Sequence, residues 1–280
     1  MNNVVLTGNG QFVREPIEKF FDLQVEESVK EIDFVLQVPH IYIDSEKILL
    51  LDDLYYLLNK CNVLINTLTP IAYRYSICSE RNSYQREKTV LYYKNVIDFA
   101  SKVKAKHVLI TGTNALYDMN KEVLISNAIS TLKELSDYAK EKKVLLLLGT
   151  VLGEESINNA STPVITKLRD LKYILDQVDN QNLNAYLDLE VISACGETID
   201  MWFKELEDKI KFVRFTDGNY NGYRILGKGV LPLKKYLEEL KEFGYTGPLS
   251  LNIPGERYVE DPYSYEKESL KVMRDLLMEV

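Results

Sequence analysis

Two carboxylates are the side chains of this 280-residue chain that could most readily perform acid–base chemistry. Asp188 and Glu190 follow the apolar run 184–187, with a single residue between them. In an extended strand both side chains would therefore lie on the same side. Two neighbouring carboxyl groups can supply a general acid and a general base in one site. We therefore name Asp188 and Glu190 as the candidate catalytic residues. The alternative is that both are solvated charges near a strand end.

Arg214 is the candidate for charge stabilisation. It lies in the next apolar run, 211–215, which is expected to neighbour the strand that ends at Asp188. A buried guanidinium needs a carboxylate partner, and Asp188 is the nearest candidate. Arg214 could therefore bind a ligand, or it could form a purely structural ion pair, and both interpretations remain open.

A glycine turn with basic residues nearby could bind phosphate. Arg224 precedes Gly227-Lys228-Gly229, and Gly255-Glu256-Arg257 follows the eighth apolar run, so backbone N–H groups and basic side chains could approach an anion there. The alternative, which we favour because a lone Gly-x-Gly is a weak motif, is that the glycines only form a turn. Polar residues near the ends of the apolar runs would suit the hydroxyl groups of a polyol. The full set of candidate substrate-binding residues is Arg214, Asn252, Gln37, Thr111, Thr150, Asp217, Arg224 and Lys228.

Eight short apolar runs must position these side chains. They begin near residues 3, 33, 63, 107, 144, 184, 211 and 248, and an amphipathic helical pattern follows each of them. This alternation predicts parallel strands with crossover helices. Eight such units predict an α/β fold, a single (β/α)8 TIM barrel over residues 1–280, with substrate-binding residues at the carboxyl ends of the strands. We expect strand ends near residues 8, 37, 66, 111, 149, 188, 216 and 252, and helices over 44–60 and 162–178 among others.

Composition excludes several classes of protein. The apolar content of 46% can form a large core, and the net charge of −8 disfavours nucleic acid as a partner, since nucleic acid needs a basic surface. No run reaches the roughly 18–20 apolar residues of a membrane helix, so no membrane partner is expected. The cysteines are far apart, without metal-ligand spacing, which favours the reducing cytoplasm.

From residue 145 to 254 the chain resembles the xylose-isomerase-like barrels, which include sugar and sugar-phosphate isomerases, epimerases and relatives of endonuclease IV. The resemblance extends more loosely over the whole chain, and it implies the barrel fold and a sugar-like ligand. The matching segments are Leu147-Leu148-Gly149-Thr150, Tyr186-Leu187-Asp188, Phe212-Val213-Arg214-Phe215-Thr216-Asp217, Leu226-Gly227-Lys228-Gly229 and Gly244-Tyr245-Thr246-Gly247-Pro248.

The resemblance also implies a divalent cation, held by Glu, Asp, His and Glu at the ends of strands five to eight. The aligned positions here are Gly149, Asp188, Arg214 and Asn252. Only Asp188 is a conventional ligand, and a guanidinium cannot coordinate a cation. We therefore expect no metal and no other cofactor, and we expect Arg214, paired with Asp188, to take over the charge of the cation.

Three functions remain open from the sequence. The first is a divergent sugar or sugar-phosphate isomerase or epimerase that works without the usual metal. The second is a non-catalytic barrel that binds a carbohydrate-like ligand and regulates a pathway. The third is a structural subunit of a homo- or hetero-oligomer. The first two imply a small sugar-like ligand at the mouth of the barrel, and the third implies an interface between chains.

Overall fold

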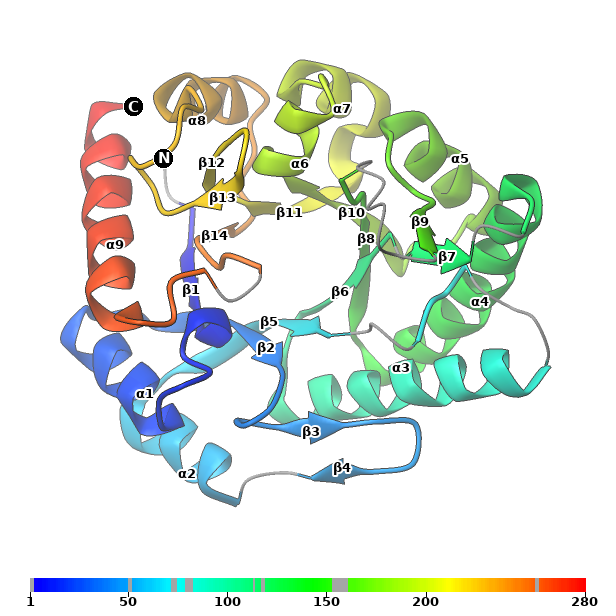
Figure 1. The fold of residues 1–280 in the computed structure, drawn as a ribbon, viewed down its shortest axis with the longest axis horizontal. Coiled ribbons are helices and arrows are strands. Elements are labelled where there is room, and N and C mark those ends of the chain that lie inside the picture. The colour runs from blue at the N-terminus through cyan, green and yellow to red at the C-terminus, as the bar shows by residue number, and fades with distance from the viewer. Residues whose placement is uncertain are drawn as a thin grey trace.

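Eight parallel strands form a closed barrel in the computed structural model, which describes residues 3–49, 52–71, 75–78, 83–112, 114–116, 119–152, 161–254 and 257–280 (Figure 1). The strands close in the order β1-β14-β11-β10-β8-β6-β5-β2. The predicted TIM-barrel fold is confirmed. The bounds of the barrel strands are β1 (Val5–Gly8), β2 (Glu31–Leu36), β5 (Leu64–Pro70), β6 (His107–Thr111), β8 (Leu145–Gly149), β10 (Leu183–Asp188), β11 (Ile210–Arg214) and β14 (Leu249–Ser250).

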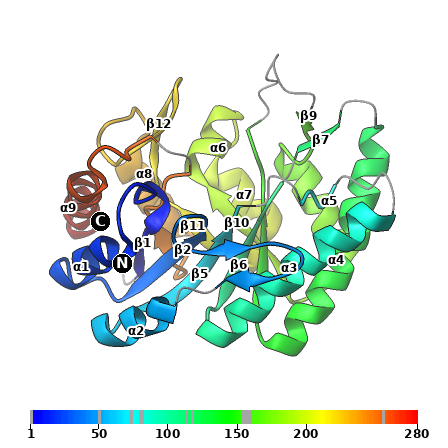
Figure 2. The ribbon, with the colours of Figure 1, turned by 60° about the horizontal axis from the view of Figure 1, so that its bottom comes forward.

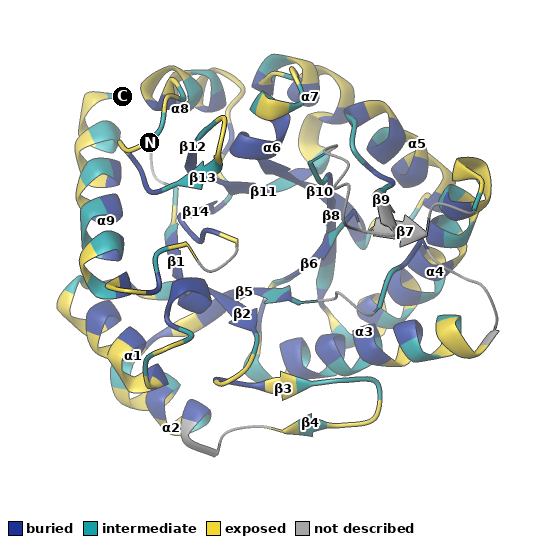
Figure 3. Ribbon diagram, viewed as in Figure 1, coloured by how far each residue is buried: buried dark blue, intermediate teal, exposed yellow. Residues whose placement is uncertain are grey.

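Helices surround the barrel and pack their apolar faces against the strands (Figure 3). Their bounds are α1 (Ile17–Glu26), α2 (Asp52–Cys61), α3 (Ser83–Val103), α4 (Lys121–Lys142), α5 (Leu168–Val178), α6 (Leu189–Ala194), α7 (Ile199–Leu206), α8 (Leu233–Glu242) and α9 (Pro262–Glu279), with short 3-10 helices η1 (Asn9–Gln11) and η2 (Glu207–Lys209). Polar side chains cap the first turn of several of these helices. The Thr198 hydroxyl accepts the N–H of Met201 at the start of α7, and the Asp261 carboxylate accepts the N–H of Ser264 at the start of α9, where Pro262 is the first helical residue. Within the described residues, no helix has both the length and the apolar character that crossing a membrane requires.

The inside of the barrel is filled by its own side chains. Leu6, Leu109, Leu147, Tyr186 and Phe212 are buried and pack together in the barrel centre. The ring of Tyr186 meets that of Phe212 edge-on, with 6.2 Å between centroids. Along each strand these inward-facing residues alternate with outward-facing ones, and they fill the barrel centre. Polar side chains can therefore enter the barrel at the strand ends.

The described residues also form three antiparallel strand pairs outside the barrel sheet, which the sequence did not predict. In Figure 2 the β12–β13 hairpin and the β7–β9 pair lie above one end of the barrel. The pairs are β3 (Tyr42–Ile43) with β4 (Ile48–Leu49), β7 (Asn114–Leu116) with β9 (Ser161–Pro163), and β12 (Asp217–Asn219) with β13 (Gly222–Arg224).

The prediction of a helix over residues 44–60 is wrong for the first part of that range. The Asp44 carboxylate accepts the N–H groups of Glu46 and Lys47, at 2.7 and 2.8 Å, and so forms the turn between β3 and β4. The helix itself begins only at Asp52. An aspartate followed by polar residues can begin either a turn or a helix. Here it forms a turn, because the residues on either side of it pair as β3 and β4.

Two other expected boundaries also differ. The helix expected from residue 162 begins at Leu168, because Ser161–Pro163 pairs with β7 instead. The third barrel strand continues to Pro70, past the expected end at residue 66, because β2 pairs with it along its whole length.

The first and last helices close the ring of helices through charged contacts. Arg274 of α9 donates to Glu27 at 2.7 Å, and Lys267 pairs with Glu26 at 2.5 Å. Glu266, on the same helix, is only 7% exposed, and burial raises the pKa of its carboxyl to about 8. This helix therefore holds a buried acid that ionises only at mildly alkaline pH.

Candidate active site at the barrel mouth

An ion pair is buried at the carboxyl ends of β10 and β11. Asp188 and Arg214 are register partners, and the Arg214 Nη1 donates to Asp188 Oδ2 at 3.0 Å. Their side chains are 2% and 5% exposed, respectively. Burial opposes the charged guanidinium, but the carboxylate of Asp188 and the other surrounding groups outweigh it and raise the pKa of Arg214. The expected pairing of the two residues is confirmed.

Both oxygens of Asp188 accept further hydrogen bonds. The hydroxyl of Tyr223, from the β12–β13 hairpin, donates to Oδ2 at 2.9 Å. Oδ1 accepts the backbone N–H of Val191 at 3.4 Å and so caps α6. Asp188 therefore holds three elements together, the end of β11, the hairpin and the first turn of α6.

Glu190 does not share a strand face with Asp188, and that expectation is wrong. The strand ends at Asp188, and Glu190 lies in the first turn of α6, where its side chain is buried against the β12–β13 hairpin. A Cβ at Gly218 would lie 2.6 Å from the Cγ of Glu190, so the hairpin approaches this side chain closely. Burial raises the pKa of Tyr223, and Asp188 and Glu190 both contribute, so the two carboxylates flank one phenol.

Asp33 is a third buried carboxylate at the mouth, and the sequence analysis missed it. It lies on β2 and accepts hydrogen bonds from Thr69 at 2.6 Å, Ser250 at 2.9 Å and the Asn252 amide nitrogen at 3.2 Å. Burial raises the pKa of Asp33, and the nearby charge of Arg214 opposes this. The sequence signal was a single aspartate at the start of the apolar run that contains the second strand.

Two glycines make room for larger side chains inside the mouth. A Cβ at Gly149 would lie 2.2 Å from Cζ of Tyr186, so this tyrosine occupies the space beside the end of β8. The guanidinium carbon of Arg214 lies 5.6 Å from the centroid of the Tyr186 ring, within the range of a cation–π contact. On the other side, a Cβ at Gly8 would lie 2.4 Å from Cγ of Asn252.

The residues at the four aligned positions do not fit a divalent cation. Asp188 is the single anionic donor among them, Arg214 places a positive charge at the same point, and Gly149 offers no side chain. Over the ranges that the structure describes, there is no group of three or more His, Cys, Asp and Glu arranged to hold a metal.

The turn considered for phosphate binding is organised by a carboxylate. Asp217 Oδ2 accepts the N–H groups of Gly227 at 3.1 Å and Gly229 at 2.9 Å, and Oδ1 accepts those of Gly218 and Leu231 at 2.8 and 3.1 Å. The two glycine N–H groups are thus already bound by a protein anion. This geometry supports the turn interpretation of the Gly-x-Gly motif, and it gives Asp217 a structural role.

The two basic residues near this turn also have protein partners. Lys228 pairs with Glu268 of α9 at 2.6 Å, and its side chain is half exposed. The Arg224 Nη1 donates to the carbonyl oxygen of Tyr223 at 2.8 Å. The structure therefore does not bring Arg224 and Lys228 together with Arg214.

Three further candidates lie at the ends of their strands. Gln37 donates to the Gly10 carbonyl at 3.0 Å, and the hydroxyl of Thr111 accepts from Tyr186 at 3.5 Å. Thr150 is buried just after β8. Their roles in binding remain predictions.

Three buried polar atoms at the mouth have no hydrogen-bond partner within the described part of the chain. They are Arg214 Nε, Thr216 Oγ1 and Asn252 Oδ1. Leaving such an atom without any partner costs roughly 1–3 kcal/mol, so a ligand or water at these points is favoured. Thr216 was missed as a site residue, because it lies just after the end of β11 and strand alternation does not place its side chain.

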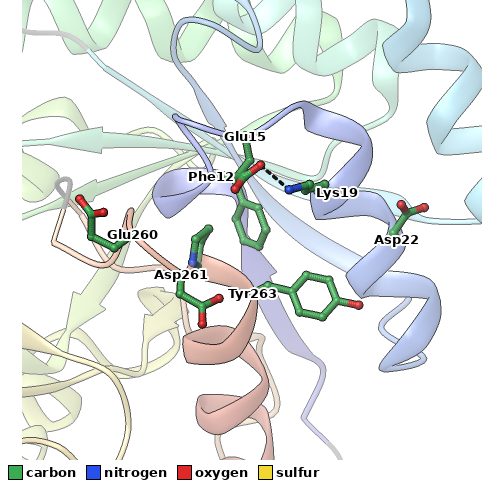
Figure 4. Close-up of a pocket in the computed structure, with 8 residues that line it drawn as sticks. Phe12, Glu15, Lys19, Asp22, Glu260, Asp261 and Tyr263 are labelled. Carbon is green, nitrogen blue, oxygen red and sulfur yellow. Dashed lines mark ion pairs between the residues drawn. The ribbon is translucent and has the colours of Figure 1, made fainter.

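A separate hollow lies outside the barrel, between the first and last helices (Figure 4). Glu15 and Lys19, which lie together on the α1 side of this hollow, form an ion pair at 2.7 Å. Half of its lining residues are acidic and none is a predicted site residue, so this hollow is distinct from the mouth. The residues that line it are Phe12, Glu15, Lys19, Asp22, Glu260, Asp261, Pro262 and Tyr263.

Known proteins resemble this chain in both sequence and structure. The family model of the xylose isomerase-like TIM barrel matches residues 44–276. The fructoselysine 3-epimerase of Shigella flexneri is 24% identical over 200 residues, which cover 71% of this chain and 70% of that protein. A D-tagatose 3-epimerase-like protein superposes with a TM-score of 0.79 at 18% identity over 98% of both chains. D-psicose 3-epimerase from Clostridium cellulolyticum H10 superposes with a TM-score of 0.75 at 13% identity over 99% of both.

Proposed function

This chain belongs to the xylose isomerase-like TIM barrel family, and on that premise we propose that its mouth binds a sugar-like polyol without a divalent metal. Arg214 takes the electrostatic place of the cation. The observation that carries the proposal is the buried pair of Arg214 and Asp188, which joins two of the four aligned ligand positions at 3.0 Å. We also propose a cytoplasmic location, with which the lack of a disulfide among Cys61, Cys78 and Cys195 is consistent.

The reaction that fits this arrangement is an isomerisation or epimerisation next to a carbonyl group. A fixed guanidinium stabilises the oxyanion that forms when a proton leaves the neighbouring carbon, and a carboxylate moves the proton. Asp188 already accepts three hydrogen bonds, so we assign it the positioning of Arg214 and assign proton transfer to Glu190.

A second candidate is a barrel that binds a polyol and does not catalyse. It is favoured by the side chains of Tyr186 and Asn252, which fill the spaces beside Gly149 and Gly8 where a substrate could otherwise extend. Incubation of D-fructose with the protein in deuterated water distinguishes the two candidates. Deuterium at the carbon beside the carbonyl supports the enzyme, and bound but unexchanged sugar supports the non-catalytic barrel.

The purified protein should carry no stoichiometric manganese, magnesium, zinc or cobalt at the mouth. The reason is the donor set at the four aligned positions, where the single carboxylate, Asp188, is already paired with Arg214. The guanidinium repels a cation by roughly 4 kcal/mol per unit charge at about 4 Å and an effective dielectric of 20. Elemental analysis after purification without chelators measures this. Asp188→Asn is the matched control, because near-stoichiometric metal that disappears in this variant would contradict the proposal.

Thr216→Val should weaken sugar binding and leave the fold as stable as before. The hydroxyl that it removes is buried and has no partner among the described residues, so the protein loses no internal hydrogen bond. If this hydroxyl binds the ligand, the dissociation constant should rise about tenfold, which corresponds to about 1.4 kcal/mol. Calorimetric titration with D-fructose measures the affinity, and Thr131→Val, buried in α4, serves as the control. Equal affinities in the two variants would count against a ligand at Thr216.

A further inference from the structure

We infer that Tyr223 is a positioning residue, whose hydroxyl fixes the pair of Asp188 and Arg214 so that Nε of Arg214 stays available to the ligand. The inference rests on the proposed function. Two features of the mouth lead to it: a buried ion pair that meets through a single hydrogen bond, and a hydroxyl from outside the barrel sheet that binds the same carboxylate oxygen.

The buried ion pair has one hydrogen bond where its two groups could form two. Nη1 of Arg214 donates to Oδ2 of Asp188, and Nε of Arg214 is buried without a hydrogen-bond partner among the described residues. Arginine frequently binds a carboxylate through two parallel hydrogen bonds, one to each oxygen. In the planar guanidinium, Nε shares an edge with Nη2 and not with Nη1, so this edge is not the one bound to Asp188. The Nε donor is therefore left for another molecule.

The carboxylate of Asp188 is held in this orientation chiefly by Tyr223. The tyrosine hydroxyl donates at 2.9 Å to Oδ2, the oxygen that also accepts from Arg214. The other oxygen accepts the N–H of Val191 at 3.4 Å, which is long for a hydrogen bond and holds it only weakly. The hydroxyl of Tyr223 is thus the group that keeps the carboxylate from rotating to offer both oxygens to the guanidinium.

Tyr223 is itself fixed by the β12–β13 hairpin. Arg257, from the loop after β14, donates to the carbonyl oxygen of Asn221 at 2.5 Å, next to the start of β13. Nη1 of Arg224 donates to the carbonyl oxygen of Tyr223 at 2.8 Å. Burial raises the pKa of Tyr223, so its hydroxyl keeps the proton that it donates to Asp188.

A second carboxylate whose charge acts on Arg214 is already bound elsewhere. Asp33 accepts hydrogen bonds from Thr69, Ser250 and Asn252, so it is not placed to take Nε. Without the hydroxyl of Tyr223, Asp188 is the carboxylate that can turn. Arg214 should then bring its Nε edge to Asp188 and form the bidentate pair, which withdraws the donor from the mouth.

The crystal structure of Tyr223→Phe tests the positioning without a ligand. Nε and Nη2 of Arg214 should both lie within hydrogen-bond distance of Asp188 in this variant. Tyr245→Phe is the matched control, because it also removes a tyrosine hydroxyl that donates at 2.9 Å, here to the carbonyl oxygen of Pro248 before β14 begins. It should leave the ion pair unchanged. If Arg214 keeps its single Nη1 contact in Tyr223→Phe, the inference is wrong.

Calorimetric titration with D-fructose tests the consequence for binding. The dissociation constant should rise at least about tenfold in Tyr223→Phe, as expected when one hydrogen bond from a charged group is lost, and should not change in Tyr245→Phe. Wild-type affinity in Tyr223→Phe overturns the inference while the proposed function stands. If the wild type does not bind D-fructose, the proposed function fails, and the crystal structure of the variant still decides the positioning.

Urea unfolding distinguishes positioning from a purely structural role. Tyr245→Phe loses one buried hydrogen bond and should unfold at a lower urea concentration than the wild type. Tyr223→Phe should unfold close to the wild type, because Asp188 regains a hydrogen bond from Arg214. Tyr223→Phe that is as unstable as Tyr245→Phe, and that still binds D-fructose normally, would show that the hydroxyl only supports the fold.

Discussion

Arg214→Ala should lower the free energy of unfolding by about 3–5 kcal/mol and leave the unfolding transition cooperative. The variant leaves the carboxylate of Asp188, which is 2% exposed, in the barrel without its charged partner. It also removes the positive charge that acts on Asp33 and the packing against the ring of Tyr186. Equilibrium unfolding in urea at neutral pH, followed by circular dichroism, measures the loss.

Removing both members of the pair distinguishes a charge effect from a packing effect. Arg214→Met combined with Asp188→Asn leaves no unpaired charge, so it should unfold at a higher urea concentration than Arg214→Ala. Lys211→Ala, which removes a half-exposed cation from the same strand, should change the stability by less than about 1 kcal/mol. A loss of that small size in Arg214→Ala would mean that the ion pair does not stabilise the fold.

Glu266→Gln should stabilise the protein at alkaline pH. Burial raises the pKa of this carboxyl from 4.5 to about 8, so the folded state holds the proton more tightly than the unfolded chain. The stability that comes from this proton is fully present below pH 4.5 and is lost as the pH rises through 8. At pH 9 the wild type therefore lacks up to about 5 kcal/mol that the neutral glutamine keeps. Near pH 5 the two proteins should differ little.

Urea unfolding of wild type and variant across this pH range provides the measurement, and the difference between the two profiles isolates Glu266. The histidines His40 and His107 have pKa values lowered by burial, so their contributions change at acidic pH and cancel in the difference. Glu268→Gln, an exposed glutamate on the same helix, is the control and should give a flat difference. A flat profile for Glu266→Gln too would show that this carboxyl is ionised in the folded protein.

The barrel could be predicted from the sequence because its strands are apolar runs at regular spacing, a pattern that depends on local composition. The short hairpins could not be predicted in the same way. Tyr42–Ile43 and Ile48–Leu49 are two residues each, too short for a periodicity, and Ser161–Pro163 pairs with a strand far away in the chain. The boundaries that failed are those where such a pairing competes with a helix start.

The site was partly predictable for a related reason. Arg214 and Asp188 end neighbouring parallel strands, so the barrel topology and the family resemblance together place them side by side. Glu190 was misplaced because Asp188 ends its strand and begins a helix at once. Asp33 was hidden in an apolar run, and the role of Tyr186 depends on a glycine on the neighbouring strand. These relations exist only in the closed barrel.

The contact between Tyr186 and Gly149 also bears on how this barrel can change in evolution. A carboxylate introduced at position 149 by one substitution would place its Cβ 2.2 Å from the tyrosine ring, so the ring would first have to leave the barrel centre. Loss of the ring alone would open a cavity in the packed interior, which typically costs about 3–5 kcal/mol for an aromatic side chain. Each step is harmful without the other, so the two positions are epistatic. A carboxylate at position 149 is therefore compatible with a stable barrel only when position 186 changes with it.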